Sequence, residues 1–254
     1  MKPHGRSGYR FVLTQTGLEF LWLEKLFMHG EYDRAMAPRV FMTVVHAVAV
    51  AAAGWLLLGG GLHALQADWG AHWSLATPGR RWLLFGAAFI YFLRVCVTSF
   101  YLLKRKMRWG EAVLIAVWVT LIELLFALLG GVNSRTVGLV TALGMVLYLA
   151  GSFLNTASEF QRKRWKERPE NAGHLFTGGL FRYAMHVNYF GDELLFTGYA
   201  LITGRAWALL VPLLMLAGFR FFNIPELDRH LRARYGAEFE ACARRTRRFV
   251  PFLY

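Results

Sequence analysis

Four polar residues recur at helical spacing in one short stretch of the chain. They are Asn155, Glu159, Lys163 and Lys166. On a continuing α-helix, residues three or four positions apart lie on one face, so these side chains would form a single stripe. Amide and carboxylate groups bind ribose hydroxyls and ammonium groups bind phosphates, so the stripe suits a nucleotide. The same pattern is also typical of a solvated helix end that carries only topological charge, and spacing alone leaves both interpretations open.

A second polar group enters the apolar, glycine-interrupted stretch at residues 178–193. It contains His186, Asn188, Asp192 and Glu193. Acidic residues at membrane depth are tolerated where they line a cavity, so this stretch indicates an internal site. The sequence offers no strand followed by GxGxxG and no GxxxxGK[ST], so neither a dinucleotide-binding sheet nor a phosphate-binding loop is available. A nucleotide would therefore have to be held by the helices themselves.

Ionisable residues also lie inside long apolar runs, where an uncompensated charge costs several kcal/mol. Tyr91 and Arg94 occupy one run, three positions apart and thus on one helix face, while Glu123 and His46 occupy two others. We predict a polar pocket inside a helix bundle, formed by Tyr91, Arg94 and Glu123 together with His46. Two simpler interpretations are open: Arg94 and Glu123 could pair only to join two helices, and His46 could be an ordinary packing residue.

The elements that must position these residues are apolar helices. Of the 254 residues, 56% are hydrophobic and 18% are charged, whereas a soluble domain carries about 25% charge. A helix crosses a bilayer with roughly 20 apolar residues. Six runs approach that length: residues 39–62, 82–103, 111–129, 136–154, 175–202 and 207–222. We predict an all-α, polytopic transmembrane bundle of six to seven helices, built as one membrane domain over residues 1–254 with four spans within residues 39–154.

The first segment, residues 1–38, differs from these runs. Polar residues interrupt its apolar stretch at 11–27, and no small-residue cleavage pattern follows. The pattern predicts an amphipathic helix on the membrane surface rather than a cleaved signal peptide.

Positive charge is concentrated between the apolar runs. The formal net charge is +13, which in a soluble protein would suggest a nucleic-acid partner. Here the basic segments at 104–108 and 161–168 and the C-terminal tail alternate with segments that hold little positive charge. The positive-inside rule then places both termini in the cytoplasm if the spans number six, and nucleic acid is not expected as a partner. Cys96 lies in an apolar run and Cys242 in the basic tail, so neither a disulfide nor a metal site is expected.

The C-terminal half carries a set of motifs in a fixed order. Asn155, Glu159, Lys163 and Lys166 are followed by GGLF-x-Y-x-x-x-x-N-Y-x-G-D at 178–192, by Tyr235-Gly236, and by Val-Pro-Phe at 250–252. This order and spacing resemble the steroid 5α-reductase family, and Tyr91-x-x-Arg94 is similar to the family's Tyr-x-x-Arg. Membrane sterol reductases share the Asn-Tyr-x-Gly-Asp core, and isoprenylcysteine methyltransferases share a looser form of it.

The resemblance implies a multi-helix bundle with an NADPH cavity open to the cytoplasm, built mainly by residues 155–254. By motif position, the cofactor would contact Asn155, Glu159, Lys163, Lys166, Asn188, Asp192 and Tyr235. Arg105 or Arg108 would lie near the 2′-phosphate. The implied substrate is a steroid or related lipid enone, with Tyr91 polarising the carbonyl and Arg94 on the substrate side. No obligatory protein partner is implied.

One part of the family pattern is missing. The steroid enzymes place a Gln-Glu pair early in the chain to assist the tyrosine, whereas the run at 39–62 contains no acid. Glu123, His46, or one of the N-terminal acids Glu19 and Glu24 could take its place. The departure concerns the 3-oxo-Δ4-steroid substrate and leaves the NADPH residues unaffected.

Two other function classes compete with the reductase. An S-adenosylmethionine-dependent isoprenylcysteine or phospholipid methyltransferase would show Arg-His-Pro-x-Tyr-x-Gly where this chain has His186-Val-Asn188-Tyr189-Phe-Gly191. The missing proline, together with Asn188 and Asp192, favours the reductase. A non-catalytic membrane scaffold or lipid-binding protein would have no use for the polar stripe or for the acids at 192–193.

Overall fold

The computed structural model describes residues 36–253 except residue 71, and it confirms the predicted all-α fold. The α-helices are α2 (Met36–Leu58), α3 (Gly61–Trp69), α4 (Pro78–Val97), α5 (Trp109–Gly131), α6 (Leu139–Lys166), α7 (Val187–Thr203), α8 (Leu210–Gly218), α9 (Ile224–Tyr235) and α10 (Ala237–Arg245). Shorter turns are the π-helices η1 (Thr98–Leu102) and η5 (Phe219–Asn223) and the 3₁₀ helices η2 (Pro169–Asn171), η3 (Gly179–Arg182) and η4 (Ala206–Leu209). In the described ranges, β-pairing is confined to one isolated bridge, between Ala184 and Arg247.

Five helical segments are long and apolar enough to cross a membrane, as expected of an integral membrane protein. They are Met36–Leu58, Pro78–Leu102, Trp109–Gly131, Leu139–Lys166 and Ala206–Tyr235. Their outer faces expose large apolar side chains such as Val48, Leu121 and Phe153, which lipid would cover.

The run predicted as a span at 175–202 differs from that expectation. Its helix, α7, begins only at Val187 and has 17 residues, a rise of roughly 25 Å. The apolar residues before it do not face lipid. Phe176, Leu180 and Phe181 instead pack with Ala184 and Val187 in a small separate cluster below the bundle. Hydropathy alone cannot distinguish such a packed loop from the first turns of a span.

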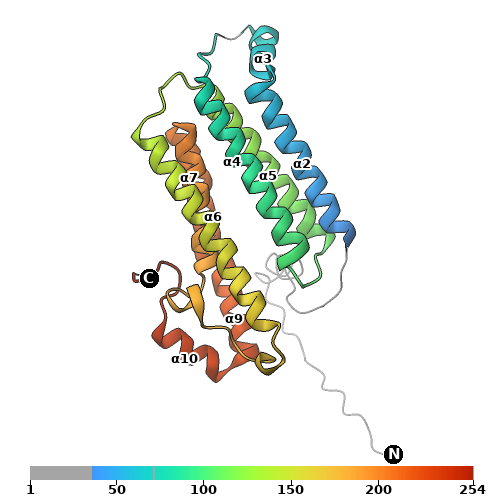
Figure 1. Ribbon diagram of the computed structural model, residues 1–254, viewed down its shortest axis with the longest axis vertical. Coiled ribbons are helices and arrows are strands. Elements are labelled where there is room, and N and C mark those ends of the chain that lie inside the picture. The colour runs from blue at the N-terminus through green and yellow to red at the C-terminus, as the bar shows by residue number, and fades with distance from the viewer. Residues whose placement is uncertain (1–35, 71, 254) are drawn as a thin grey trace, which may run out of the picture.

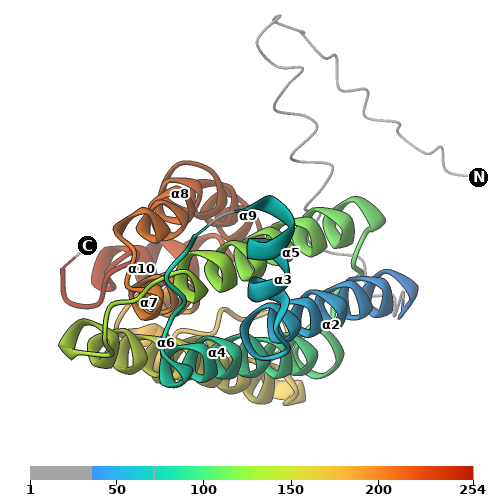
Figure 2. The ribbon, with the colours of Figure 1, turned by 90° about the horizontal axis from the view of Figure 1, so that it is seen from above.

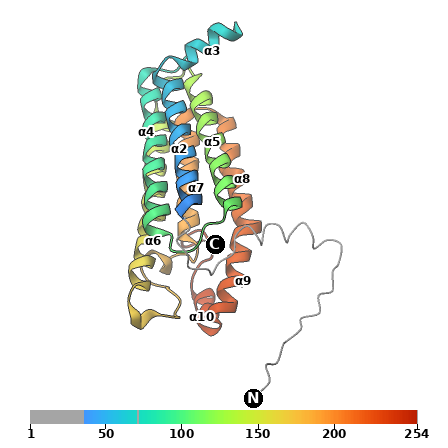
Figure 3. The same ribbon diagram turned by 90° about the vertical axis from the view of Figure 1, so that its right-hand side faces the viewer.

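The helices run alternately up and down, so residue 36 and the C-terminal tail lie at the same end of the bundle (Figures 1 and 3). We call this the basic end, because it carries loop 104–108, the C-terminus of α6 and helices α9 and α10. The end that carries α3 is the opposite end (Figure 3). Six crossings were predicted; among the described residues, five helical segments have the length and apolarity of a span, and α7 is not one of them. The amphipathic helix predicted at 11–27 lies outside the described residues.

Local signals explain where the helices near the site begin and end. Thr77 precedes α4, and its hydroxyl accepts a hydrogen bond from the Arg80 amide at 3.5 Å, while Pro78 occupies the first helical turn. Helix α7 ends at Gly204, which adopts the left-handed conformation with φ 69°. Both ends lie at the opposite end of the bundle, so α7 descends to the basic end with its N-terminus there.

Helices α6 and α7 pack in unusually close contact through four glycines, which we call the glycine seam: Gly144, Gly151, Gly191 and Gly198. A Cβ atom on Gly151 would lie 2.4 Å from the carbonyl oxygen of Gly191, and one on Gly198 would lie 2.4 Å from the amide nitrogen of Tyr148. Small residues let membrane helices approach to backbone contact. The seam therefore sets the polar residues of α6 directly against those of α7.

Viewed along the bundle, α7 lies among the other helices rather than at their edge (Figure 2). Leu195, Phe196 and Tyr199 of α7 are buried in the main core together with residues of α2, α4, α5 and α6. The Tyr199 hydroxyl donates to the carbonyl of Leu84 at 3.3 Å. Helix α7 is thus the element that brings polar groups into the centre of the bundle.

Candidate functional site

The carboxylate of Asp192 joins three helices. Its Oδ1 accepts a hydrogen bond at 2.8 Å from Nη2 of Arg94 on α4, and its Oδ2 accepts one at 3.0 Å from Nδ2 of Asn155 on α6. The same Asn155 nitrogen lies 3.0 Å from the carbonyl oxygen of Asn188. The close approach of Gly151 and Gly191, one position from Asp192, makes these contacts possible.

The hydrogen bonds continue from here toward the basic end. The side-chain amide of Asn188 donates to Oε1 of Glu159 at 3.0 Å, and the other oxygen of Glu159 pairs with Arg162. The resulting polar chain consists of Arg94, Asp192, Asn155, Asn188, Glu159 and Arg162. Five of these residues were predicted from the sequence. Arg162 was missed, although its position three residues after Glu159 on one helix was a signal for the pair.

The inner end of the polar chain has unused hydrogen-bonding capacity. Nε and Nη1 of Arg94 and Oε2 of Glu193 are buried and have no partner among the described residues. Buried donors and acceptors normally find partners, because each one left unmade costs about 1–3 kcal/mol. The Arg94 guanidinium can therefore donate to an oxygen of a bound molecule while it remains paired with Asp192.

The two predicted lysines lie at the basic end but contact different neighbours. Nζ of Lys163 donates to Glu167 at 2.7 Å and lies 3.8 Å from the ring centroid of Tyr101. Nζ of Lys166 donates to the hydroxyl of Tyr235 on α9 at 2.6 Å. Hydrogen bonds from Lys163 and then from Lys104 lower the pKa of the Glu167 carboxyl. Lys166 and Tyr235, both predicted cofactor residues, are thus brought together across 69 positions of sequence.

The predicted 2′-phosphate residues lie on the loop between η1 and α5. The guanidinium of Arg105 holds both carboxylate oxygens of the buried Glu111, one of them at 2.7 Å. Arg39 fixes the same loop by donating to the carbonyl of Arg105 at 2.6 Å. Arg105 is therefore committed to Glu111 in this structure, and a role of Arg105 or Arg108 toward a phosphate stays a prediction. No pattern in the sequence indicates the part played by Arg39.

The ionisable residues inside the bundle are paired differently from the simpler expectations. Arg94 does not pair with Glu123, and His46 is not a lone packing residue. Instead Nε2 of His46 lies 2.8 Å from Oε1 of Glu123, with side chains that are each 1% exposed, while Arg94 pairs with Asp192. Arg94 of α4 faces α7, where it meets Asp192. The partner of Glu123 therefore comes from α2, as His46.

Tyr91 lies between these two pairs. Its ring centroid is 5.4 Å from that of His46, and the guanidinium carbon of Arg94 is 5.1 Å from the Tyr91 ring centroid. Phe196 of α7 packs edge-on against the same ring at 5.2 Å. The residues predicted to form an internal polar pocket are therefore neighbours, and their catalytic roles stay predictions. Glu19 and Glu24 lie outside the described residues.

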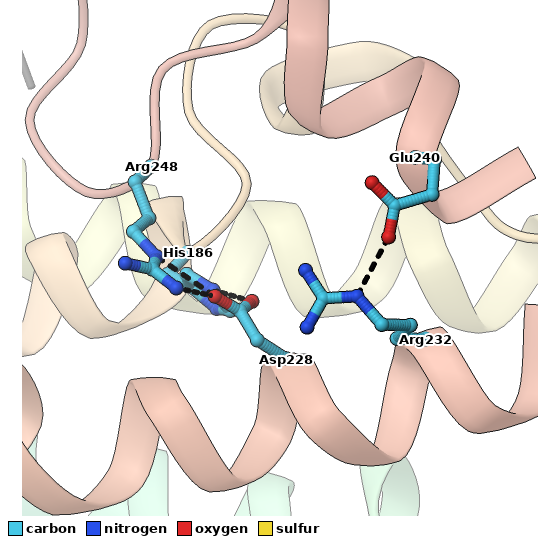
Figure 4. A network of polar contacts seen from close by, with 5 residues as sticks. All are labelled: His186, Asp228, Arg232, Glu240 and Arg248. Carbon is cyan, nitrogen blue, oxygen red and sulfur yellow. Dashed lines mark hydrogen bonds and ion pairs between the residues drawn. The ribbon is translucent and has the colours of Figure 1, made fainter. Parts of the chain in front are cut away.

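A second ion-pair group lies just before the start of α7 (Figure 4). Asp228 of α9 accepts from Nε of Arg248 at 2.8 Å, and its other oxygen lies 2.8 Å from Nε2 of His186. The backbone amide of His186 also donates to the carbonyl of Arg248 at 3.0 Å. We call these three residues the clasp. The exposed pair of Arg232 and Glu240 lies beside it in Figure 4 and does not join it.

The clasp explains how the N-terminus of α7 is held in place. It ties the residue before α7 to α9 and to the C-terminal tail, and Asn188 follows two positions later. His186 stood out in the sequence without a role, whereas Asp228 and Arg248 were missed. They lie in a charged tail whose sequence shows no periodicity that would single them out.

A family model described as "Protein of unknown function (DUF1295)" matches residues 33–246. This chain belongs to the DUF1295 family. The matched range includes every predicted site residue that the structure describes. The chain is also 30% identical over 98 residues to "Probable O-methyltransferase ustE" of Ustilaginoidea virens, an alignment that covers 37% of this chain and 34% of that protein. The match thus spans about a third of the relative's length.

The polar side chains of this DUF1295 chain change in kind along the site. Among residues 36–70 and 72–253, no group of three or more His, Cys, Asp and Glu side chains is placed to hold a metal ion. What the site does offer is a buried tyrosine and guanidinium at one end, amides and carboxylates in the middle, and basic side chains at the outer end. This order suits an elongated ligand with a neutral head and an anionic tail.

Proposed function

We propose that this DUF1295 protein is a membrane-embedded, NADPH-dependent reductase of a carbon–carbon double bond in a lipid, with a steroid-like enone as the substrate class. The observation that carries the proposal is the polar chain, which runs without a break from the Arg94 and Tyr91 neighbourhood to Arg162 at the basic end. The association of the family with steroid 5α-reductase-like proteins supports it.

The chemistry of the donor set fits a dinucleotide phosphate. Lys166, Tyr235 and Arg162 would bind phosphate oxygens, and Glu159 and Asn188 would bind ribose hydroxyls and amide groups. NADPH would supply a hydride. The residues of the chain itself would then polarise the substrate: the Tyr91 hydroxyl would hydrogen-bond the carbonyl oxygen, and the unused Arg94 nitrogens would donate to the same polar region.

The side of the membrane follows from charge. The basic end carries Lys104, the arginines and lysines at the end of α6, and the arginine-rich tail. Such segments remain in the cytoplasm under the positive-inside rule, and NADPH is a cytoplasmic metabolite. The proposed orientation therefore puts the cofactor end of the site on the cytoplasmic side and the Tyr91 end within the bilayer.

A methyltransferase is the second candidate, favoured by the similarity to the probable O-methyltransferase ustE. Its methyl donor, S-adenosylmethionine, carries a sulfonium cation and no phosphate. The basic residues Arg162, Lys163, Arg164 and Lys166 at the end of α6 match the phosphates of NADPH better than they match that ligand. The buried Tyr91 beside Arg94 also matches carbonyl polarisation, which methyl transfer does not require.

The deciding experiment measures binding of NADPH, NADH and S-adenosylmethionine to the detergent-purified protein by calorimetry. NADPH is expected to bind more tightly than NADH, and Lys166→Ala is expected to weaken NADPH binding about tenfold, because one phosphate contact is lost. Arg135→Ala, which removes an exposed cation from the opposite end, is the matched control and should leave affinity unchanged. Binding of S-adenosylmethionine with no response to NADPH would overturn the reductase in favour of the methyltransferase.

A further inference from the structure

His46 and Glu123 form an isolated acid–base pair inside the bundle. They come from α2 and α5, their side chains are each 1% exposed, and a single contact of 2.8 Å joins them. An ionisable residue at membrane depth is rare and usually serves a pathway or a reaction. Because an imidazole and a carboxyl group can hold one proton between them and remain neutral as a pair, this arrangement avoids a net buried charge.

Three polar atoms around the pair have no hydrogen-bond partner in the part of the chain that the structure describes. They are Nδ1 of His46, Oε2 of Glu123 and Oγ1 of Thr120. Thr120 precedes Glu123 by three positions on α5, so the two side chains share a helix face. A purely structural pair would gain nothing from leaving such atoms unpaired, since each costs free energy when buried. Each of these atoms can take part in a further hydrogen bond, which a proton that enters or leaves the pair requires.

Three other titratable groups around the pair are held by partners outside it. Arg94 of α4 is held by Asp192 of α7. The hydroxyl of Tyr148 on α6 donates to the carbonyl of Ala87 at 2.6 Å. The hydroxyl of Tyr199 on α7 likewise donates to the Leu84 carbonyl.

The fourth group is Tyr91 of α4, which also lies against the Arg94 guanidinium. Its ring packs directly on that of His46, at 5.4 Å between centroids. Phe92 closes another side of the imidazole, with its centroid at 5.3 Å. Tyr91 is therefore a titratable side chain in direct ring contact with the imidazole of the pair.

We propose that His46 and Glu123 together store one proton inside the membrane and return it to the Tyr91 oxygen after Tyr91 has given its own proton to the substrate. The catalytic part of this inference rests on the proposed function. Reduction of an enone adds one hydride and one proton. The hydride forms the new C–H bond at the β-carbon as the π-bond breaks and its electrons move to the carbonyl oxygen. The Tyr91 O–H proton goes to that oxygen, and the enol so formed returns to the ketone as this proton moves to the α-carbon and the C=O bond is restored. The pair reprotonates the Tyr91 phenolate and regains its proton from water.

The storage of a proton is tested without any substrate. Protein reconstituted in lipid and labelled with ¹⁵N-histidine is examined near neutral pH by infrared and solid-state NMR spectroscopy. The expected result is one proton on the pair, seen either as a protonated carboxyl band that Glu123→Gln removes or as an imidazolium signal that His46→Asn removes. Glu111→Gln is the matched control, since this buried acid on the same helix faces the permanently charged Arg105. An ionised Glu123 beside a neutral His46 would overturn the proposal.

The proton transfer is tested by kinetics with NADPH and progesterone as the probe enone. Glu123→Gln is expected to keep NADPH affinity within about twofold and to slow steady-state turnover about 100-fold, the typical scale of general acid catalysis. The first turnover should be affected far less, because Tyr91 begins with its own proton. Equal slowing of the first and later turnovers would overturn the relay. Failure of the wild-type protein to bind NADPH would instead refute the proposed function, and the spectroscopic result would still decide whether the pair stores a proton.

Discussion

Two buried arginines, one near each end of the bundle, are satisfied by different kinds of acceptor. At the opposite end, both terminal nitrogens of Arg80 donate to backbone carbonyls, those of Ile202 at 2.7 Å and Thr136 at 3.0 Å among them. Toward the basic end, Arg94 donates to the Asp192 carboxylate and retains two unpartnered nitrogens in the described structure. A backbone acceptor cannot turn without moving the chain, whereas a carboxylate can rotate to accommodate a ligand.

The Arg80 arrangement serves the fold. Ile202 lies in the last turn of α7, where the carbonyls carry partial negative charge and lack helical partners. A Cβ atom on Gly204 would lie 2.5 Å from Nη1 of Arg80, so the glycine leaves room for the guanidinium. An arginine whose acceptors are carbonyls stabilises the end of a helix. An arginine that is paired with a carboxylate and keeps unpartnered N–H groups is available for chemistry.

The largest expected effect is on stability, from Arg80→Met. Removing the guanidinium leaves the carbonyls of Ile202, Arg135 and Thr136 without this donor, and we expect a loss of about 4 kcal/mol in the free energy of unfolding. NADPH affinity of the protein that remains folded should not change. Thermal unfolding in detergent followed by nucleotide titration checks both. Arg81→Met, which removes one longer bond to Leu57 at 3.3 Å, is the control, and an equal loss there would contradict the special role of Arg80.

Asp192→Asn should affect NADPH binding more strongly than stability, the opposite of Arg80→Met. It leaves the mostly buried Arg94 without a counter-charge, which we expect to cost about 3 kcal/mol, and it should abolish measurable NADPH binding because the polar chain is cut. The double variant Arg94→Met, Asp192→Leu should recover most of the stability and none of the binding. Recovery of binding in the double variant would show that the ion pair is only structural. Unfolding and calorimetric binding curves of the three proteins provide the measurement.

The clasp stabilises the fold at the basic end through its ion pairs, and its loss is expected to have an effect of intermediate size. Asp228→Asn weakens contacts to both His186 and Arg248, and we expect a loss of about 2 kcal/mol. Hydrogen exchange at residues 184–190 should accelerate, since the start of α7 is released. Glu240→Gln, which removes the exposed neighbouring pair, should leave exchange there unchanged. Slow exchange retained in Asp228→Asn would mean that the tail backbone alone holds α7.

The smallest expected effect concerns pH at the surface of the basic end. The Leu175 amide and then His174 hydrogen-bond Glu238 and lower the pKa of its carboxyl. Because the folded-state pKa lies below the unfolded one, the stabilisation is present above the ordinary glutamate pKa of about 4.3 and is lost as pH falls through the folded value. Exchange of the Leu175 amide, corrected for intrinsic rate, should rise over that window. The rise should be absent in Glu238→Gln.

Sequence patterns were sufficient for the fold where one physical property decides it. Apolar length predicts the long helices, because the thickness of the bilayer constrains that length directly. The start of α7 could not be predicted in this way. Phe176 and Phe181 belong to one packed cluster, and this packing rather than contact with lipid explains why they are apolar.

The site was predictable to the extent that its residues share one helix or one motif. The spacing of Asn155 and Glu159 placed them on the face that meets Asn188 and Asp192. The partner of Glu123 was not predictable, because it depends on the relative depth and rotation of α2, α4 and α5, which no local pattern encodes. The same holds for the meeting of Asp228 with the C-terminal tail.

The glycine seam also has an entropic consequence. A helix pair joined through leucines loses about 0.5–1 kcal/mol of rotamer freedom for each side chain that becomes fixed. The seam glycines have no rotamers, so α6 and α7 gain close packing without that loss. The backbone freedom that glycine gives up is lost when each helix forms in the bilayer, before the two associate. The rigidity of the support under Asn155 and Asp192 is thus mainly enthalpic, and the separation of these two residues is expected to change little as temperature rises.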